Sequence, residues 1–328
     1  MSHGRWQQRL VRTWYSHSRW SLLLLPLSWL FCAFAVLRRS AYRSGLLRRH
    51  ALGVKVVVVG NITVGGTGKT PMVIALVQRL QRTGLCVGIL CRGYRGRSRH
   101  WPLRVTAASD PQQVGDEAVL LAARTGAPVF AGPDRLAAGR ALLAQHPCDV
   151  LICDDGLQHY RLRRDLEILL VDPRRGYGNR QCLPAGPLRE PLSRLQTVDA
   201  VVEYGAAAGR RFGTTLSIST ACRLADPPES RPLDAFSGQS VHAVAGIADP
   251  QRFFSALRGV GIEVEPHAFP DHHAFSAEDL AFDDSRPVLM TEKDAVKCAA
   301  FAASHWWSVP AELELDAAFV DWLVGSLK

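Results

Sequence analysis

The stretch GNITVGGTGKTP, residues 60–71, carries the residue types of a phosphate-binding loop. Glycines free successive backbone N–H groups to point into one concavity at a helix N-terminus, where the helix dipole also attracts anions. Lys69 would reach the β- and γ-phosphates of a nucleotide, and the Thr70 hydroxyl would ligate Mg²⁺. The common Walker A pattern would place its first glycine at position 63, where this chain has threonine. The expected nucleotide cradle is Thr63, Val64, Gly65, Gly66, Thr67, Gly68, Lys69 and Thr70.

A second block suited to this chemistry is DVLICDDG, residues 149–156, where an apolar run ends in Asp154 and Asp155. Carboxylates at the end of such a strand can hold Mg²⁺ directly or through its water shell. Neighbouring residues of a strand point to opposite faces, so the sequence leaves open which aspartate contacts the metal. With the glycine loop, this block predicts nucleotide-dependent phosphoryl chemistry with an acceptor still unknown.

Phosphoryl transfer also needs a group that positions or deprotonates the nucleophile, and cations that balance charge on the transferring phosphoryl. Five further blocks carry suitable residue types, although from composition alone surface charge or a helix cap explains each of them better. The candidates are Asp116 and Glu117 in VGDEA, Asp271, His272 and His273 in FPDHHAF, Arg92 and Arg95 in CRGYRGR, Arg135 in GPDR, and Arg189 and Glu190 in PLREP.

The elements that must position these residues alternate between strand and helix patterns. Residues 54–60, VKVVVVG, form an apolar run typical of a strand buried on both faces of a parallel sheet. Residues 71–84 follow as a helix that begins at a proline and ends at a glycine. Further strands are expected at 85–91, 149–155 and 166–172, with helices around 115–124 and 133–145. This order predicts a doubly wound α/β domain like that of P-loop NTPases.

The composition divides the chain into four segments. A basic and apolar arm at residues 1–50 precedes a P-loop core domain at 51–220. A linker is expected at 221–236, where the sequence is rich in proline and charge. A second strand and helix pattern, with strands at 241–247 and 287–291, predicts a smaller α/β domain at 237–328 that closes over the active site.

The formal net charge of +9 belongs to the N-terminal arm. Residues 1–50 contain nine arginines and no acidic residue, so residues 51–328 are formally neutral and a nucleic-acid-binding face is not expected. The arginines flank WSLLLLPLSWLFCAFAVL, residues 20–37, and four tryptophans of the arm suit a membrane interface. Charge on both flanks favours a helix that lies in or dips into one leaflet over a full span.

Two other interpretations of the arm are weaker. A cleaved signal peptide would export the nucleotide site away from its nucleotide, and a buried core helix does not suit nine uncompensated arginines. The eight cysteines form no C-x-x-C pair and no His/Cys cluster at zinc spacing, which indicates a reduced, cytosolic catalytic part.

Eight blocks of the chain, in order, resemble the tetraacyldisaccharide 4′-kinase family of lipid A biosynthesis. The blocks are GNITVGGTGKTP, CRGYRGR, VGDEA, GPDR, CDDGLQHYRLRRDLEILLVD, LPAGPLREP, FPDHHAF and LMTEKDAVK. The resemblance implies transfer of the γ-phosphate of ATP to the 4′-hydroxyl of a tetraacyldisaccharide 1-phosphate, giving lipid IVA at the cytoplasmic face of the inner membrane. It implies ATP and Mg²⁺ as cofactors, a helix anchored in or through the membrane, and neither nucleic acid nor an obligate protein partner.

The same resemblance implies roles for individual residues. Asp116 and a histidine of FPDHHAF, His272 rather than His273, would form a catalytic dyad with Lys69 nearby, and which member takes the proton stays open. Leu157 departs from the phenylalanine usual in the family, a change of packing. Expected metal ligands are Thr70, Asp154, Asp155 and Glu117, and expected substrate contacts are Arg92, Arg135, Gln158, His159, Arg189 and Glu190.

The rival interpretation is a membrane-associated regulatory ATPase or GTPase of the MinD-like or signal-recognition group. Those ATPases carry a lysine just before the glycine pair, where this chain has Val64. GTPases present N-K-x-D to guanine, and neither Asn61 nor Asn179 lies in that pattern. The sequence leaves open the acyl-chain preference, the oligomeric state and the number of Mg²⁺ ions.

Overall fold

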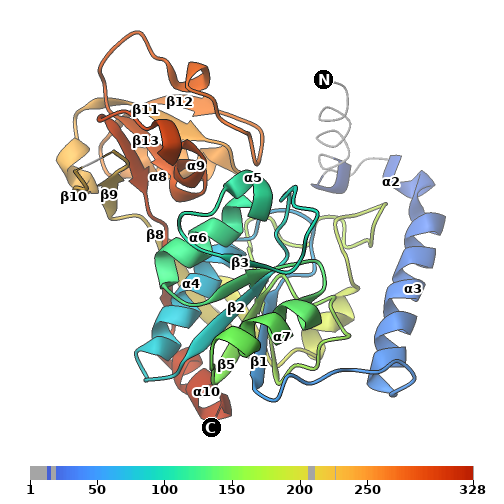
Figure 1. Cartoon of the computed structure of the whole chain (residues 1–328). Helices are drawn as coiled ribbons and strands as arrows, with labels where there is room; N and C mark the ends of the chain where they lie inside the picture. Colours follow the sequence, from blue (N-terminus) through green and yellow to red (C-terminus); the bar gives the residue numbers. More distant parts are fainter. Residues whose placement is uncertain (1–12, 16–19, 206–210, 226, 328) are drawn as a thin grey trace.

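The chain folds around two β-sheets in the computed structural model (Figure 1). The structure describes residues 13–15, 20–205, 211–225 and 227–327. The first sheet has nine strands in the order β15-β8-β7-β6-β1-β5-β2-β4-β3. Its seven central strands are parallel, and the edge strands β15 and β3 are antiparallel to their neighbours. Its strands are β1 (Lys55–Gly60), β2 (Val87–Cys91), β3 (Leu103–Val105), β4 (Val129–Ala131), β5 (Val150–Asp154), β6 (Leu166–Val171), β7 (Ala200–Tyr204), β8 (Phe212–Ser217) and β15 (Glu312–Leu315).

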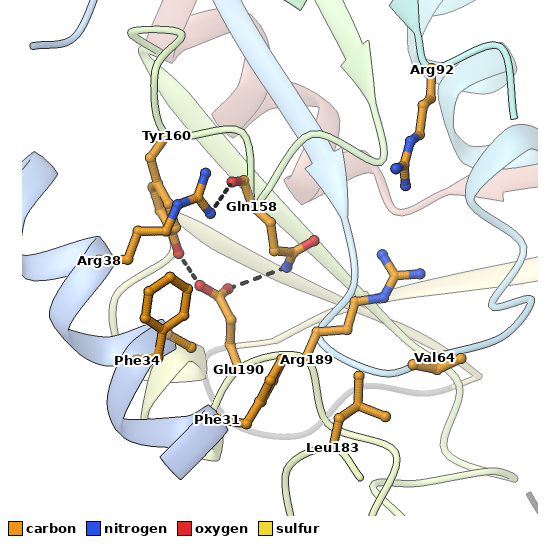
Figure 2. A pocket seen from close by; sticks show the side chains of 11 residues that line it. Phe31, Phe34, Arg38, Val64, Arg92, Gln158, Tyr160, Leu183, Arg189 and Glu190 are labelled. Atoms are coloured by element: carbon orange, nitrogen blue, oxygen red, sulfur yellow. Dashed lines mark hydrogen bonds between the residues drawn. The ribbon is translucent and has the colours of Figure 1, made fainter. Parts of the chain in front are cut away.

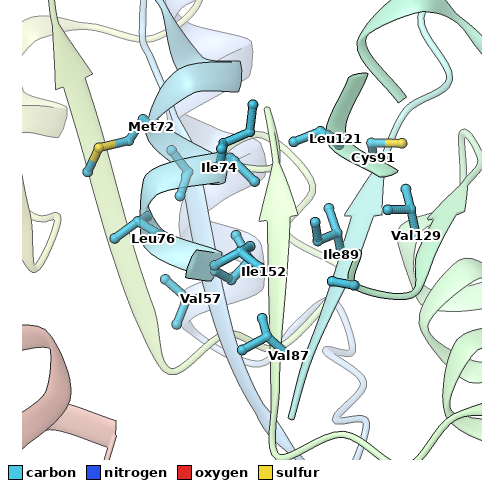
Figure 3. Close-up of a cluster of buried hydrophobic side chains, with 14 of the residues drawn as sticks. Val57, Met72, Ile74, Leu76, Val87, Ile89, Cys91, Leu121, Val129 and Ile152 are labelled. Carbon is cyan, nitrogen blue, oxygen red and sulfur yellow. The ribbon is translucent and has the colours of Figure 1, made fainter. Parts of the chain in front are cut away.

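Helices cover both faces of this sheet, which explains the continuous valines of β1. Val57 and Val59 pack into the cluster beneath α4, α6 and α10 (Figure 3), whereas Val56 and Val58 pack against α7 on the other face. Both faces of the strand are therefore apolar, as expected for a central parallel strand. The α-helices packed on this sheet are α4 (Lys69–Gln81), α6 (Asp116–Thr125), α7 (Arg135–Gln145) and α10 (Ala317–Leu327), and α5 (Pro111–Val114) precedes α6.

The second sheet has six strands in the order β10-β9-β14-β13-β11-β12. Four of them, β14, β13, β11 and β12, are parallel, and β9 and β10 extend the sheet in the antiparallel sense. Its strands are β9 (Thr220–Arg223), β10 (Ser230–Pro232), β11 (Ser240–Ala245), β12 (Glu263–Ala268), β13 (Val288–Thr291) and β14 (Trp306–Val309). Its helices are α8 (Pro250–Gly259) and α9 (Glu292–Cys298), with short 3₁₀ turns at η2 (Leu233–Phe236), η3 (Glu278–Leu280) and η4 (Ala299–Phe301).

The predicted domain boundaries need two corrections. The expected linker at 221–236 instead contributes β9, β10 and η2 to the second sheet, where Leu233 and Phe236 are buried in the core. The expected C-terminal domain ends early, because β15 pairs with β8 and α10 packs into the core of the first sheet. The described charged residues and the prolines of 221–236 lie wholly or partly at the surface, but the few apolar residues of this segment decide where it packs.

The N-terminal arm is described from Trp20 onward and at 13–15, and its residues 1–12 and 16–19 lie outside the described residues. Helix α2 (Trp20–Leu23) leads into α3 (Leu25–Arg43), which lies along the side of the first domain (Figure 1). Trp14, expected at a membrane interface, is instead buried and donates from its indole nitrogen to Pro184 O at 2.9 Å. Among the described residues, no helix has the length and apolar character needed to cross a membrane.

Candidate active site

The glycine loop between β1 and α4 is held in a conformation that its glycines make possible. Gly65 and Gly68 have φ angles of 108° and 70°, in the left-handed region that favours glycine. A Cβ at Gly68 would collide with the hydroxyl of Tyr204, which donates to Gly68 O at 3.2 Å. The last residue before α4 must therefore be glycine.

Polar side chains brace the loop. Asn61 donates from Nδ2 to the Thr67 hydroxyl at 2.9 Å and accepts at Oδ1 from Lys69 Nζ at 3.3 Å. Arg175 donates from its guanidinium to Gly66 O at 2.8 Å. The Lys69 ammonium also lies 3.6 Å from Asp155, so a cation stands between the loop and the acidic end of β5.

The two aspartates at the end of β5 have different surroundings. Asp155 has a φ of 47°, and both of its carboxylate oxygens accept from Arg189 at 3.0 and 2.9 Å. Burial opposes ionisation of Asp155, yet Lys69 and Arg189 lower its pKa to about 2. Asp155 is thus ionised and already engaged with two cations.

Asp154 instead has a carboxylate oxygen to spare. Its side chain is 5% exposed, and Oδ1 has no hydrogen-bond partner among the described residues. Burial, and then the charge of Glu117, raise the pKa of Asp154 to about 7. A buried carboxylate that lacks a partner beside a phosphate cradle fits a divalent cation, which would supply the missing charge. Thr70, another expected metal ligand, lies in the first turn of α4, directly after the glycine loop.

A histidine from the second domain reaches an aspartate of the first. His272 Nδ1 lies 2.9 and 3.1 Å from the two carboxylate oxygens of Asp116, at the start of α6. Burial raises the pKa of Asp116, but the His272 hydrogen bond and the charge of Lys293 outweigh it and lower the pKa overall. His273, in contrast, contacts Asp279 at 3.2 Å. The structure therefore brings His272, not His273, to Asp116.

Lys293, from α9, completes this cluster. Its ammonium lies 3.1 Å from His272 Nε2, 3.0 Å from Glu117 and 3.3 Å from Asp271. Burial opposes the charge of Lys293, but Glu117, Asp116 and Asp271 raise its pKa. Because an ammonium only donates, His272 Nε2 accepts and Nδ1–H donates to Asp116, which makes the imidazole neutral and the carboxylate ionised.

A cavity of about 350 Å³ opens beside the loop, between α3 and the core of the first domain (Figure 2). Aromatic rings of α3 line one side, and three guanidinium groups, from Arg38, Arg92 and Arg189, line the cavity with them. This mixture suits a ligand with apolar chains and anionic groups. The lining residues are Phe31, Phe34, Ala35, Arg38, Val64, Arg92, Gln158, Tyr160, Leu183, Arg189 and Glu190.

Glu190 is a buried residue of the cavity lining. It accepts hydrogen bonds from the Tyr160 hydroxyl, from Gln158 Nε2 at 3.3 Å and from Arg194 Nε at 3.3 Å. Arg38 of α3 donates to Gln158 O at 3.2 Å, so the helix is tied to the same network (Figure 2). Glu190 therefore holds the side chains of Tyr160 and Gln158 in place, and Gln158 contributes a polar group to the cavity lining.

Two predicted substrate contacts, Arg135 and His159, are not among the residues that line this cavity. Arg135 is 3% exposed and donates to Gly132 O at 2.9 Å and to Asp154 O at 3.4 Å, which braces the end of β5 from behind. His159 Nε2 is buried without a hydrogen-bond partner, 3.8 Å from Asp134. Burial, and then the charge of Arg135, lower the pKa of His159 to about 4, so this ring is neutral.

Several residues of the site were not predicted from the sequence. Lys293 lies in the TEKDAVK block, but nothing in its spacing shows that it reaches His272. Arg175 and Tyr204 hold the glycine loop from positions far along the chain, and no local pattern marks them. Tyr160 stands two residues after Gln158, and its burial with Glu190 depends on the packing of α3.

The chain matches known proteins over nearly its whole length. The family model described as tetraacyldisaccharide-1-P 4′-kinase matches residues 20–328. A protein of Nitrosococcus oceani named tetraacyldisaccharide 4′-kinase is 53% identical over 312 residues, which cover 94% of this chain and 91% of that protein. A protein of Methylobacillus flagellatus with the same name is 51% identical and covers 99% of this chain and 97% of its own length.

One solved structure has the same fold. The LpxK of Aquifex aeolicus, in a crystal structure with ATP, superimposes with a TM-score of 0.81 at 29% sequence identity. The superposition covers 94% of this chain and 99% of that one. The two-sheet architecture described above is therefore shared with an ATP-binding protein.

Proposed function

The chain belongs to the tetraacyldisaccharide-1-P 4′-kinase family, and from that membership and the site geometry we propose that it phosphorylates a lipid disaccharide. The reaction transfers the γ-phosphate of ATP to the 4′-hydroxyl of a tetraacyldisaccharide 1-phosphate and gives lipid IVA in lipid A biosynthesis. ATP is the donor, which agrees with the ATP complex of the Aquifex aeolicus relative.

The observation that carries this proposal is the contact between Asp116 and His272 beside the phosphate cradle. Glu117 follows Asp116 directly and acts electrostatically on Asp154, which Lys69 of the loop also influences. On the other side, Ala248 of the second domain approaches Gly66, at 3.1 Å from an added Cβ. The proton acceptor and the phosphate cradle therefore border the same space, as in-line transfer to a hydroxyl requires.

The residues of the chain divide the reaction between them. The oxygen of the 4′-hydroxyl bonds to the γ-phosphorus, the bond from that phosphorus to the β–γ bridging oxygen breaks, and ADP leaves. Asp116, ionised at neutral pH, receives the hydroxyl proton, and His272 holds its carboxylate in place. Lys69 and the loop N–H groups stabilise the negative charge of the transferring phosphoryl. The low pKa of Asp116 suffices, because a loose transition state needs the proton removed late.

Mg²⁺ is the expected companion of ATP. Asp154 offers a free carboxylate oxygen. Thr70, at the start of α4, and Glu117, whose charge acts on Asp154, are the proposed further oxygen donors. A bound Mg²⁺ would neutralise phosphate charge at this position. Asp155 has a different task in this proposal, since it holds Lys69 and Arg189 in place through ion pairs.

The cavity beside α3 is the proposed acceptor site. Phe31 and Phe34 would contact acyl chains, and the guanidinium groups of Arg38, Arg92 and Arg189 would bind anionic groups of the sugar. Arg135, which is buried and donates to Asp154 O, supports the end of β5 in this proposal rather than contacting the substrate. His159 is half-buried beside Asp134 and is not among the residues that line this cavity.

Membrane association follows from the substrate and from α3. An acylated disaccharide leaves a bilayer only at high cost in free energy, so its kinase must work at the membrane surface. The outer face of α3 exposes Leu27, Leu30 and Leu37, each more than half exposed, and arginines follow near its C-terminal end. We place the protein at the cytoplasmic face of the inner membrane, with this face of α3 in the lipid.

The test is a phosphoryl-transfer assay with γ-labelled ATP and tetraacyldisaccharide 1-phosphate in mixed micelles. Label should appear in the lipid at its 4′ position, and Asp116→Asn and His272→Gln should each lower kcat at least about a hundredfold with little change in ATP affinity. Fluorescent-ATP binding serves as the control for folding. ATP hydrolysis without any labelled lipid would instead favour the regulatory ATPase interpretation.

A further inference from the structure

A cluster of metal-ligating side chains lies in the second domain, apart from the residues assigned to phosphoryl transfer. Among the residues that the structure describes, His242, Glu265 and His267 form the group whose ligand atoms all lie within 4.8 Å of one another. His242 lies on β11, and the other two lie on the adjacent parallel strand β12. The sequence separates these residues too widely for a zinc pattern, and the pairing of the two strands brings them together.

The separations suit one shared ion. His242 Nδ1 lies 2.9 Å from His267 Nε2, and Glu265 oxygens lie 3.8 and 3.7 Å from these two nitrogens. Donor atoms at such distances can share an ion at about 2 Å from each, the bond length of zinc to imidazole nitrogen and carboxylate oxygen. A water molecule would complete four-coordination on the exposed side of Glu265.

Surrounding groups orient these ligands. The other nitrogen of His242, Nε2, lies 3.0 Å from Asp284 Oδ1, so a proton on Nε2 leaves the Nδ1 lone pair facing the cluster. Phe282 stacks on the His242 ring at 3.9 Å and 13°. Arg286 binds one oxygen each of Asp284 and Glu265, both at 2.7 Å. A buried imidazole with a carboxylate behind it is the arrangement that metal-binding histidines usually have.

We propose that His242, Glu265 and His267 bind one divalent transition metal ion of the zinc class. Two imidazoles and a single carboxylate favour zinc over Mg²⁺, which prefers oxygen donors. Binding would replace the hydrogen bond between the two imidazoles: the proton of His267 would move from Nε2 to Nδ1 by exchange with solvent, and His242 Nδ1 and His267 Nε2 would each donate a lone pair to the ion. The ion would join β11 to β12, and β12 leads directly into the loop that carries His272. The site is thus structural, separate from the Mg²⁺ of the kinase reaction, and independent of the proposed function.

The test measures Zn²⁺ binding to the purified full-length chain after treatment with a chelator. Titration calorimetry should show one equivalent of Zn²⁺ bound, with a rise in melting temperature that Mg²⁺ does not reproduce. Co²⁺ in place of Zn²⁺ should give visible absorption bands of a tetrahedral ion. His267→Gln should weaken Zn²⁺ binding at least about tenfold, and Asp284→Asn should weaken it less, as expected for an orienting partner.

Matched variants separate this site from others. Glu265→Gln, at an exposed position, tests the cluster without risk to folding and should also weaken binding. His305→Gln, a histidine of the same domain outside the cluster, and His272→Gln in the dyad should both bind Zn²⁺ like the unchanged chain. No bound Zn²⁺, or equal binding by His267→Gln and the unchanged chain, would overturn the proposal and leave a hydrogen-bonded histidine pair.

Discussion

Lys293 is the side chain through which α9 reaches the dyad. Its ammonium contacts His272 Nε2, Glu117 and Asp271, and its own side chain is 17% exposed. The contact with Nε2 fixes the imidazole tautomer, because the lysine can only donate. In the proposed mechanism Lys293 is a positioning residue, since it acts on the sugar hydroxyl only through His272 and Asp116.

Replacing Lys293 by methionine keeps the length of the side chain and removes its charge. We expect kcat to fall about ten- to a hundredfold with KM for ATP nearly unchanged, because the dyad loses its orientation and the loop does not. Steady-state kinetics measure this split. A variant Lys293→Arg should recover part of kcat, and an equal effect of methionine on kcat and on ATP affinity would indicate a general structural role.

Asp154 has a buried charge that the protein alone does not compensate. Its pKa is raised from 3.8 to about 7, so the folded chain holds the Asp154 proton more tightly than the unfolded chain does. The stability that this proton contributes is fully present below pH 3.8 and is lost as pH rises to 7. Asp154→Asn has no such proton to lose, so its stability does not fall for this reason. The metal-free variant should gain stability over the unchanged chain from pH 4 to 7, by at most roughly 4 kcal/mol at about 1.4 kcal/mol per pKa unit.

Thermal melts from pH 4.5 to 8 in the presence of a chelator measure this prediction. The difference in melting temperature should grow up to pH 7 and then level off. Mg²⁺ with ATP should stabilise the unchanged chain at pH 8 and the asparagine variant much less, since the amide carries no charge. A stability difference that does not vary with pH would contradict the assignment of this pKa to Asp154.

Among the elements, helix α3 has one face that packs on the first domain and one that is exposed. Both faces are apolar, so the composition of residues 20–37 does not tell them apart. Ser28 donates to Cys182 O at 2.7 Å, and Phe31 and Cys32 pack on the core of the first domain. Leu27 and Leu30 point outward. The helix was predicted from the sequence, and its membrane affinity stays a prediction. A run that is apolar on all sides carries no sign of which side meets protein.

Reversing the polarity of the outer face tests its role. The triple variant Leu27→Glu, Leu30→Glu and Leu37→Glu should lower binding to vesicles of anionic phospholipid at least about tenfold, since it removes buried apolar area and adds repulsion. Vesicle cosedimentation measures it. Fluorescent-ATP affinity should stay unchanged, because these residues do not touch the glycine loop, and undiminished vesicle binding would show that another surface docks.

The glycine loop and the dyad show how much a local motif predicts. Strand, loop and helix around Lys69 were predicted correctly because their signal is local: valines, then glycines, then Pro71. The meeting of Asp116 with His272 came only from resemblance, since 156 positions separate them. The zinc-class cluster had no signal at all, because strand pairing rather than spacing assembles it.

At the scale of the whole molecule, the chain leaves the first domain after β8 and returns to it with β15. The last helix, α10, buries Phe319 and Leu323 in the same core as α4 and α6. The second domain is therefore an insertion between two strands of the first sheet, joined to it twice. A boundary read from composition missed this return, because a short apolar helix at the end of a chain suits either domain.

The return of the chain predicts that a residue near the C-terminus supports nucleotide binding. Phe319 is fully buried and its ring lies 5.2 Å from that of Phe212 on β8. Phe319→Ala should cost about 3 to 5 kcal/mol of the free energy of unfolding of the first domain. Loss of bound fluorescent ATP on heating reports the unfolding of the first domain, and it should occur at a lower temperature in the variant.

Asp321→Ala, on the exposed side of the same helix, is the matched control and should leave the transition temperature unchanged. If Phe319→Ala lowered only a transition of the second domain and ATP stayed bound, α10 would belong with the second sheet after all.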